Sequence, residues 1–205
     1  MLNKGFIAGY KVVAAGVVLA AIFTQLSFGL NNIGGFNATN FFSFFTIESN
    51  TLASIVFLFS AYFILRGKVS HGLDMWRGAS TLYMVITGIV YVLLLSGLEE
   101  SLQTPIPWVN FVLHYAFPVV VLLDWFIDRP AYKITLKQGL VWLIFPIAYA
   151  IYSLIRGVMN GWYPYPFLNP VIEGGYIKVA VTSLLIAVGA YGLTVALTAV
   201  PTKKR

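Results

Sequence analysis

Long runs of apolar residues, separated by short polar connections, make up most of this chain of 205 residues. A helix needs about 20 predominantly apolar residues to cross the hydrocarbon core of a bilayer. Six runs have this length: Phe6–Phe28, Phe42–Leu65, Trp76–Leu95, Trp108–Ile127, Leu136–Arg156 and Tyr176–Val200. We therefore predict an all-α polytopic membrane protein, a single domain over residues 1–205 that consists of a bundle of six transmembrane helices. No internal repeat relates the first three runs to the last three, which disfavours a transporter built from repeats.

Composition supports this prediction and narrows the function. Hydrophobic residues make up 59% of the chain and charged residues 10%, whereas soluble proteins have about 45–50% and roughly 25%. The apolar excess must therefore face lipid, and the bilayer is an expected partner. The net charge of +6 is weak evidence for nucleic-acid binding here, and we expect no such partner and no obligate protein partner. The absence of cysteine excludes disulfides and thiolate catalysis, and neither metal-ligand spacing nor a phosphate loop predicts a metal or cofactor.

The charges of the connections alternate in sign along the chain. The connection Gly29–Asn40 carries no charge, and the third connection carries only Glu99 and Glu100. The basic residues of the other side lie at the start, in the second and fourth connections and in the tail: Lys4, Lys11, Arg66, Lys68, Arg77, Arg129, Lys133, Lys137, Lys203, Lys204 and Arg205. Only Arg156 and Lys178 depart from this pattern. By the positive-inside rule both termini are expected in the cytoplasm, with the chain spanning the plasma membrane.

Two spans carry polar side chains at spacings that put them on one helical face. Thr46 and Asn50 are four residues apart in the second span, and Asn110 and His114 are four apart in the fourth. Both spans run in the same direction across the membrane. At 1.5 Å per residue, Thr46 and His114 are expected roughly 6–10 Å below the outer interface. Equal depth in parallel helices permits contact between the hydroxyl and the imidazole.

This pair allows a catalytic interpretation and a structural one. A threonine hydroxyl is a weak nucleophile unless a base takes its proton, and histidine is the usual base. Alternatively, Thr46 bonds back to the preceding turn, and His114 is a satisfied structural group or a proton relay. Asn110 is placed to orient the imidazole, or with Asn50 to donate to an oxyanion. Asp124 follows ten residues after His114, about 15 Å further toward the cytoplasm, so it is a poor third member of a triad.

The segment after the fifth span combines a charge with aromatic residues. Arg156 either reaches the headgroups along its apolar stem or holds a substrate carboxylate or phosphate. The connection Gly157–Gly175 contains Trp162, Tyr163 and Tyr165, which suit a membrane interface. Its three prolines are expected to prevent a helix. The connection is interpreted either as an interfacial collar or as a lid over a cavity, in which case these aromatic residues are candidates for substrate binding.

These motifs resemble those of a known family. Thr46 in an aromatic-rich second span, the Asn110-x-x-x-His114 pair and the segment Gly161–Leu168 are similar to the androgen-induced and androgen-dependent membrane proteins of animals. The chain resembles still more closely the bacterial six-span relatives of that family, over nearly its whole length. The resemblance implies an intramembrane threonine hydrolase that cleaves fatty acid esters of hydroxy fatty acids, with Thr46 as nucleophile and His114 as base.

We therefore expect a lipid ester hydrolase without a cofactor, acting on such esters or on similar acyl esters. A carrier or channel for a small solute or proton is the alternative, because His114, Asn110, Glu48 and Arg156 are suited to line a polar path. That path would have to cross the whole membrane, whereas the polar cluster is expected only in the outer half, above a packed inner half. A lipid-binding or partner-binding scaffold is a third interpretation, supported by the interfacial aromatics and by small residues that suit helix contacts: Gly189, Ala190 and Gly192.

Overall fold

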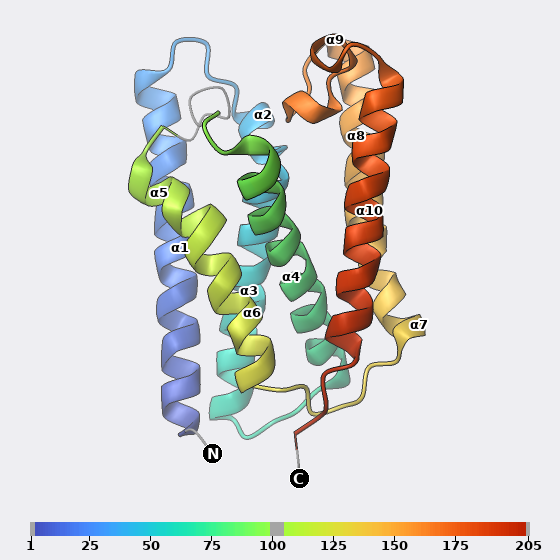
Figure 1. The fold of residues 1–205 in the computed structure, drawn as a ribbon. Helices are drawn as coiled ribbons and strands as arrows, with labels where there is room; N and C mark the ends of the chain where they lie inside the picture. Colours follow the sequence, from blue (N-terminus) through green and yellow to red (C-terminus); the bar gives the residue numbers. More distant parts are fainter. Residues whose placement is uncertain (1–2, 99–104, 204–205) are drawn as a thin grey trace.

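Figure 1 shows the computed structural model, which describes residues 3–98 and 105–203. Within this part of the chain, six helical segments are long and apolar enough to cross a membrane. They are Lys4–Asn32, Phe45–Leu65, His71–Leu95, Pro107–Ile127, Leu136–Asn160 and Tyr176–Thr198. The predicted six-helix fold is confirmed, and the chain is a multi-pass membrane protein. Both ends of the chain lie at one end of the bundle, called here the terminal end. Among the charges counted above, Glu99, Glu100, Lys204 and Arg205 lie outside the described residues.

Three of these segments are single helices and three are composite. The single helices are α1 (Lys4–Asn32), α3 (Phe45–Leu65) and α10 (Tyr176–Thr198). The first composite segment is α4 (His71–Val90) followed by the π-helical turn η1 (Tyr91–Leu95). The second consists of α5 (Pro107–Phe111), the π-helical turn η2 (Val112–Ala116) and α6 (Phe117–Ile127). The third consists of α7 (Leu136–Gly139), the 3₁₀ turn η3 (Leu140–Leu143) and α8 (Ile144–Asn160). The π-helical turn η2 interrupts its span, whereas η1 ends the span that α4 begins. Single π-helical turns are frequent at functional sites.

The connections at the opposite end contain short helices that the sequence did not predict. The second span was expected from Phe42, but α2 (Ala38–Phe42) is separate from α3. The proline-rich connection was expected to be free of helix, and this was wrong. It contains the 3₁₀ turn η4 (Pro166–Leu168) and α9 (Pro170–Glu173). Each begins with its proline, because the first helical position needs no N–H donor and suits the fixed φ of proline.

Helices α1, α3, α4 and α6 form one closely packed group (Figure 1). Helix α4 is its central element, with every residue from Arg77 to Thr87 buried. Small buried residues, Ala15 and Ala21 in α1 and Ala53 in α3, allow the backbones of these two helices to approach closely. Helix α10 is the least buried of the six segments, as expected for a helix that faces lipid.

Helix α8 reaches this group mainly through aromatic side chains. Phe145 lies 5.4 Å from Phe45 of α3 and 4.9 Å from Tyr83 of α4, measured between ring centroids. Tyr149 lies 5.0 Å from Phe45 in an edge-to-face contact. Such ring pairs prefer stacked or edge-to-face geometry, so they fix the position of α8. Because large rings bridge the distance between α8 and the group, the helices do not close against one another, and a cavity remains beside α3.

Candidate active site

Thr46 lies in the first turn of α3, a helix that begins without a polar cap. Helices α1 and α4 have such a cap: Asn3 accepts from the Gly5 N–H at 2.8 Å, and Ser70 caps α4. At the cap position of α3 stands Phe44, which makes no side-chain cap bond. Since the first N–H groups of a helix lack partners within it, α3 depends on groups from elsewhere in the chain.

Two tyrosine hydroxyls supply these partners. The Phe45 N–H donates to the Tyr149 hydroxyl at 3.2 Å, and the Thr46 N–H donates to the Tyr165 hydroxyl at 3.3 Å. The Tyr149 hydroxyl in turn donates to the Ser43 carbonyl at 2.9 Å. Both tyrosines come from the last third of the chain, so the end of α3 that carries Thr46 is held by α8 and by the connection that follows it.

The Thr46 side chain meets His114. Thr46 Oγ1 and His114 Nε2 are 3.2 Å apart, and both residues are buried. This separation allows a hydrogen bond and is within reach of the proton transfer from a nucleophile to a general base. Thr46 belongs to α3 and His114 to η2. The similar depth expected for the two residues from the sequence allowed such a contact, and the structure contains it.

Asn110 holds the opposite side of the imidazole. Asn110 Oδ1 lies 2.6 Å from His114 Nδ1, and Asn110 Nδ2 donates to the Tyr91 hydroxyl at 2.6 Å. An amide oxygen only accepts, so His114 Nδ1 carries a proton; in the neutral imidazole, Nε2 is then the acceptor for the Thr46 hydroxyl. The order hydroxyl, imidazole, asparagine amide is the arrangement of a nucleophile, a base and an orienting group.

The two π-helical turns place Tyr91 flat against His114. The ring centroids are 3.9 Å apart and the planes are inclined by 17°. The face of a tyrosine ring attracts a cation, so this stacking favours an imidazolium that forms next to it. Pro118 has no N–H to donate to the His114 carbonyl four residues earlier, which disturbs the regular helix at this point. A Cβ at Gly88 would lie 3.2 Å from Pro118, so glycine lets α4 approach here.

Asn50 lies four residues after Thr46 in α3, and its amide donates to backbone carbonyls of two helices. Asn50 Nδ2 donates to the Thr46 carbonyl at 2.8 Å and to the Leu113 carbonyl at 3.2 Å, which links α3 to η2. The amide of Asn110 donates to Tyr91 instead. Both asparagines support the Thr46–His114 pair, and neither amide N–H is directed to an oxyanion beside Thr46 in this geometry.

A cavity of about 160 Å³ opens beside Thr46. Its walls come from both sides of the molecule: α3 and α4 on one side, and α8, the η4 connection and α10 on the other. The lining is almost wholly apolar, with Ile86, Leu143, Ile147, Ile186 and Ala187 among its residues. A hydroxyl group at the wall of an apolar cavity suits a ligand that is mostly hydrocarbon.

The aromatic connection after α8 divides between the cavity and the surface. Tyr165, Phe167 and Leu168 line the cavity, which favours the lid over the interfacial collar for this part. Trp162 packs edge-to-face on Phe44, with centroids 5.7 Å apart. Tyr163 lies against Gly157 of α8, where any Cβ would overlap its ring; it is not among the cavity-lining residues.

Arg156 is held by several groups around it. Its two terminal nitrogens donate to the Ser43 hydroxyl at 2.7 Å and the Asn40 side-chain oxygen at 2.6 Å. The guanidinium lies 4.4 Å from the centroid of the Trp162 ring. Arg156 therefore ties α8 to the segment before α3. A substrate carboxylate would have to compete with these contacts or use the remaining N–H groups.

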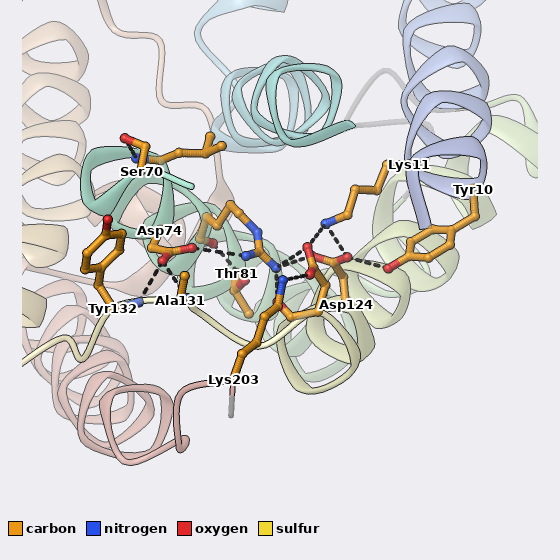
Figure 2. A network of polar contacts seen from close by, with 12 residues as sticks. Tyr10, Lys11, Ser70, Asp74, Thr81, Asp124, Ala131, Tyr132 and Lys203 are labelled. Carbon is orange, nitrogen blue, oxygen red and sulfur yellow. Dashed lines mark hydrogen bonds and ion pairs between the residues drawn. The ribbon is translucent and has the colours of Figure 1, made fainter. Parts of the chain in front are cut away.

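A second polar cluster, of a different kind, lies near the terminal end (Figure 2). Three basic and three acidic side chains form ion pairs: Lys11, Arg77 and Lys203 with Asp74, Asp124 and Asp128. The expectation that polar groups are confined to the outer half, above a packed inner half, is therefore wrong. Lys11 and Arg77, counted above among the loop charges, are buried within α1 and α4. The hydropathy pattern missed the cluster because partners from four separate segments meet only in the folded chain.

Asp128 shows how strongly these charges interact. Burial alone opposes ionisation of this carboxyl group, but the charges of Arg77 and Lys11 and the contact with Lys203 outweigh it. Together they lower the pKa of Asp128 from 3.8 to about 2. Lys203 also donates its backbone N–H to the Pro130 carbonyl at 3.0 Å. The C-terminal segment is thereby fixed to the connection after α6.

Comparison with known proteins identifies the family. A family model described as FAR-17a/AIG1-like protein matches residues 81–199, more than half of the chain. The chain belongs to the FAR-17a/AIG1-like family. The matched segment includes Tyr91, Asn110, His114 and Tyr165, whereas Thr46 precedes it. No curated protein and no solved structure matches the chain.

Two residues of the site were missed from the sequence. Tyr91 and Tyr149 lie within apolar spans, where tyrosine is common near interfaces and no spacing links either of them to Thr46 or His114. For the π-helical turn η2, Pro118 could have served as a sequence indication, because it follows His114 by four residues. The contacts of both tyrosines depend on how the helices pack, which periodicity does not describe.

Proposed function

We propose that this member of the FAR-17a/AIG1-like family is an intramembrane lipid ester hydrolase, with Thr46 as nucleophile and His114 as general base. The observation that carries the proposal is the distance of 3.2 Å between Thr46 Oγ1 and His114 Nε2, at the wall of an apolar cavity. The position of Asn110 behind the imidazole supports it. The family resemblance, which implies the same two roles, supports it independently.

The reaction proceeds through an acyl-enzyme. His114 Nε2 takes the proton of the Thr46 hydroxyl, and Oγ1 forms a bond to the carbonyl carbon of the ester. The tetrahedral intermediate collapses, the bond to the alcohol oxygen breaks, and His114 returns its proton to that oxygen. Water then gives a proton to His114 and attacks the acyl group, which leaves as a carboxylic acid while Thr46 recovers its proton. Asn110 keeps the imidazole in the required tautomer, and the Tyr91 ring stabilises the imidazolium.

We propose that the acyl chain of the substrate binds in the cavity. Its apolar walls between α3, α4, α8 and α10 suit an acyl chain. Helices α8 and α10 are the least buried of the membrane segments, so a chain is expected to enter from the lipid between them. Fatty acid esters of hydroxy fatty acids, or similar acyl esters, fit this description. Such a reaction needs no cofactor.

A carrier has less support. It requires a continuous polar lining, whereas the cavity beside Thr46 is apolar. The charges near the terminal end are paired with one another, and all of them except Lys203 are buried, which suits a structural role. Flux through proteoliposomes that is lost in His114→Ala, in a protein without esterase activity, would support the carrier.

The decisive experiment is covalent labelling of the purified protein by a fluorophosphonate probe, which reacts with activated hydroxyl nucleophiles. Wild type is expected to be labelled, and Thr46→Ala is expected to lose the label. Ser54→Ala is the matched control, because Ser54 is a buried hydroxyl of the same helix that donates only to the Asn50 carbonyl. Labelling of Thr46→Ala at the wild-type level would end the assignment of the nucleophile.

The orientation is a further part of the proposal: both termini face the cytoplasm in the plasma membrane, which puts the Thr46 site toward the outer face. The alternating loop charges support it. Because the chain has no cysteine, a single introduced thiol reports its side without background. An impermeant maleimide applied to intact cells is expected to label Asn160→Cys and not Lys68→Cys, and the reverse result would contradict the orientation.

A further inference from the structure

Ester hydrolysis by a threonine and a histidine requires a third element that these residues do not supply. When Oγ1 attacks, the electron pair of the carbonyl bond moves to the carbonyl oxygen, which becomes negatively charged. Hydrogen-bond donors already directed at that oxygen stabilise this charge, and removing one typically costs about 10²–10³ in kcat. The amides of Asn50 and Asn110 donate elsewhere, so the donors must be sought among other groups around Thr46 Oγ1.

The hydroxyl of Tyr165 is the side-chain donor best placed for this role. It lies 3.5 Å from Thr46 Oγ1 and accepts the Thr46 N–H at 3.3 Å. Both residues line the cavity, where the ester must lie. Burial raises the pKa of Tyr165 above its usual value. The hydroxyl therefore keeps its proton at neutral pH and is available as a donor.

The ring of Tyr165 is held rigidly. It stacks on Phe167 with centroids 5.3 Å apart and planes inclined by 5°, and it contacts Phe44 at 5.7 Å. A donor that is fixed before the reaction needs no reorganisation when charge develops. The contact between the Thr46 N–H and the Tyr165 hydroxyl, at 3.3 Å, is longer than the usual 2.9–3.0 Å of such bonds. A negatively charged oxygen is a stronger acceptor than a phenol, so the N–H is expected to prefer it.

From this geometry we infer that Tyr165 is a further catalytic residue, whose hydroxyl forms an oxyanion hole together with the backbone N–H of Thr46. The inference rests on the proposed hydrolase function and extends it. The attacked carbon is bonded to both Oγ1 and the oxyanion, so the oxyanion lies within reach of donors that surround Oγ1. Neither donor gives up its proton: when the electron pair returns and the alcohol leaves, both remain as they were.

A purely structural role for Tyr165 makes a different prediction. If the hydroxyl serves only as a partner for the first turn of α3, its loss lowers stability and leaves kcat unchanged. The matched control is Tyr83→Phe, because the Tyr83 hydroxyl is also buried and donates to the Trp142 carbonyl at 2.9 Å, outside the cavity lining. Both variants remove one tyrosine hydroxyl and keep the ring.

The experiment measures hydrolysis of a p-nitrophenyl acyl ester by the purified full chain. In Tyr165→Phe, kcat is expected to fall by about 10²–10³ while KM stays within threefold of wild type, and Tyr83→Phe is expected to keep wild-type kcat. A kcat of Tyr165→Phe within threefold of wild type overturns the oxyanion role and leaves the nucleophile standing. Turnover of Thr46→Ala at the wild-type rate instead overturns the proposed role of Thr46 as nucleophile.

If Tyr165→Phe does not fold, 3-fluorotyrosine at position 165 provides the second test. It keeps the shape of the ring and makes the hydroxyl more acidic. The alkaline limb of the pH profile of kcat is then expected to move to lower pH, because the donor loses its proton earlier. An unchanged profile would overturn the inference.

Discussion

The two polar clusters of this bundle are built from different kinds of groups. The cluster beside the cavity consists of uncharged residues, Thr46, His114, Asn110 and Tyr165, joined by hydrogen bonds. The cluster near the terminal end consists of ion pairs between charges that are buried except for Lys203, such as the pair of Arg77 with Asp124 at 3.1 Å. Buried charges are tolerated when they are paired, whereas neutral groups can exchange partners and protons at smaller cost. Under the proposed function, the first cluster serves the chemistry and the second the stability of the fold.

The largest effect is expected from replacing His114, the proposed base. His114→Gln removes the group that accepts the Thr46 proton, so kcat for an acyl ester should fall by about 10³–10⁴, equivalent to roughly 4–5 kcal/mol. The free energy of unfolding should change far less, because no buried charge is left unpaired. Ester hydrolysis measures kcat, and thermal unfolding in detergent measures the change in stability. Activity within tenfold of wild type would show that His114 is not the base.

At the terminal end, the expected effect is on stability. Arg77→Met leaves Asp74, Asp124 and Asp128 without their shared partner, and breaking such a buried network costs about 3–5 kcal/mol. Chemical unfolding in micelles measures the loss. Arg66→Met is the control, since Arg66 is exposed at the end of α3 and should change stability by less than about 0.5 kcal/mol. Equal effects of the two substitutions would contradict the structural role of the cluster.

A smaller effect on catalysis is expected from the orienting group. Asn110→Ala removes the 2.6 Å hydrogen bond to His114 Nδ1 but leaves the backbone carbonyl of residue 110 at 3.2 Å. The substitution also removes the hydrogen bond to the Tyr91 hydroxyl. The loss of the bond to the imidazole, about 1–3 kcal/mol, should lower kcat by roughly 10–100-fold. Hydrolysis assays check this value. An unchanged kcat would mean that the carbonyl orients the imidazole unaided.

The smallest effect concerns pH. The pKa of Asp128 is about 2 in the folded chain against a usual 3.8, so its contribution is present above pH 4 and is lost as pH falls toward 2. The shift corresponds to about 2 kcal/mol. Unfolding measured from pH 5 to pH 2 should therefore show the difference between wild type and Asp128→Asn shrinking by about that amount. A constant difference across this range would contradict the lowered pKa.

The fold was largely predictable because lipid imposes one strong rule. Every backbone polar group inside the bilayer needs a partner, so apolar runs of sufficient length become helices. The predicted spans therefore agree with the helices to within a few residues at most ends. The disagreements fall where other rules apply: Pro166 and Pro170 begin short helices, and α2 is separated from α3 before Phe45.

The site was predictable only in part. Spacing put Thr46 with Asn50 and His114 with Asn110 on common faces, and depth permitted the contact between the two helices. Spacing did not reveal Tyr149 or the stacking of Tyr91 on His114, because these contacts join segments far apart in the sequence. The ion pairs of Lys11 were missed for the same reason.

The sequence by itself determined the number of spans, the alternation of charge between connections and the residue types available for chemistry, since these follow from local hydropathy and spacing. The tertiary structure alone decided that the Thr46 hydroxyl faces His114, that Tyr165 lies over the first turn of α3, and that Arg77 meets three carboxylates. The physical reason is that hydrogen bonds and ion pairs depend on distances of about 3 Å. Such distances between remote segments are set by helix packing.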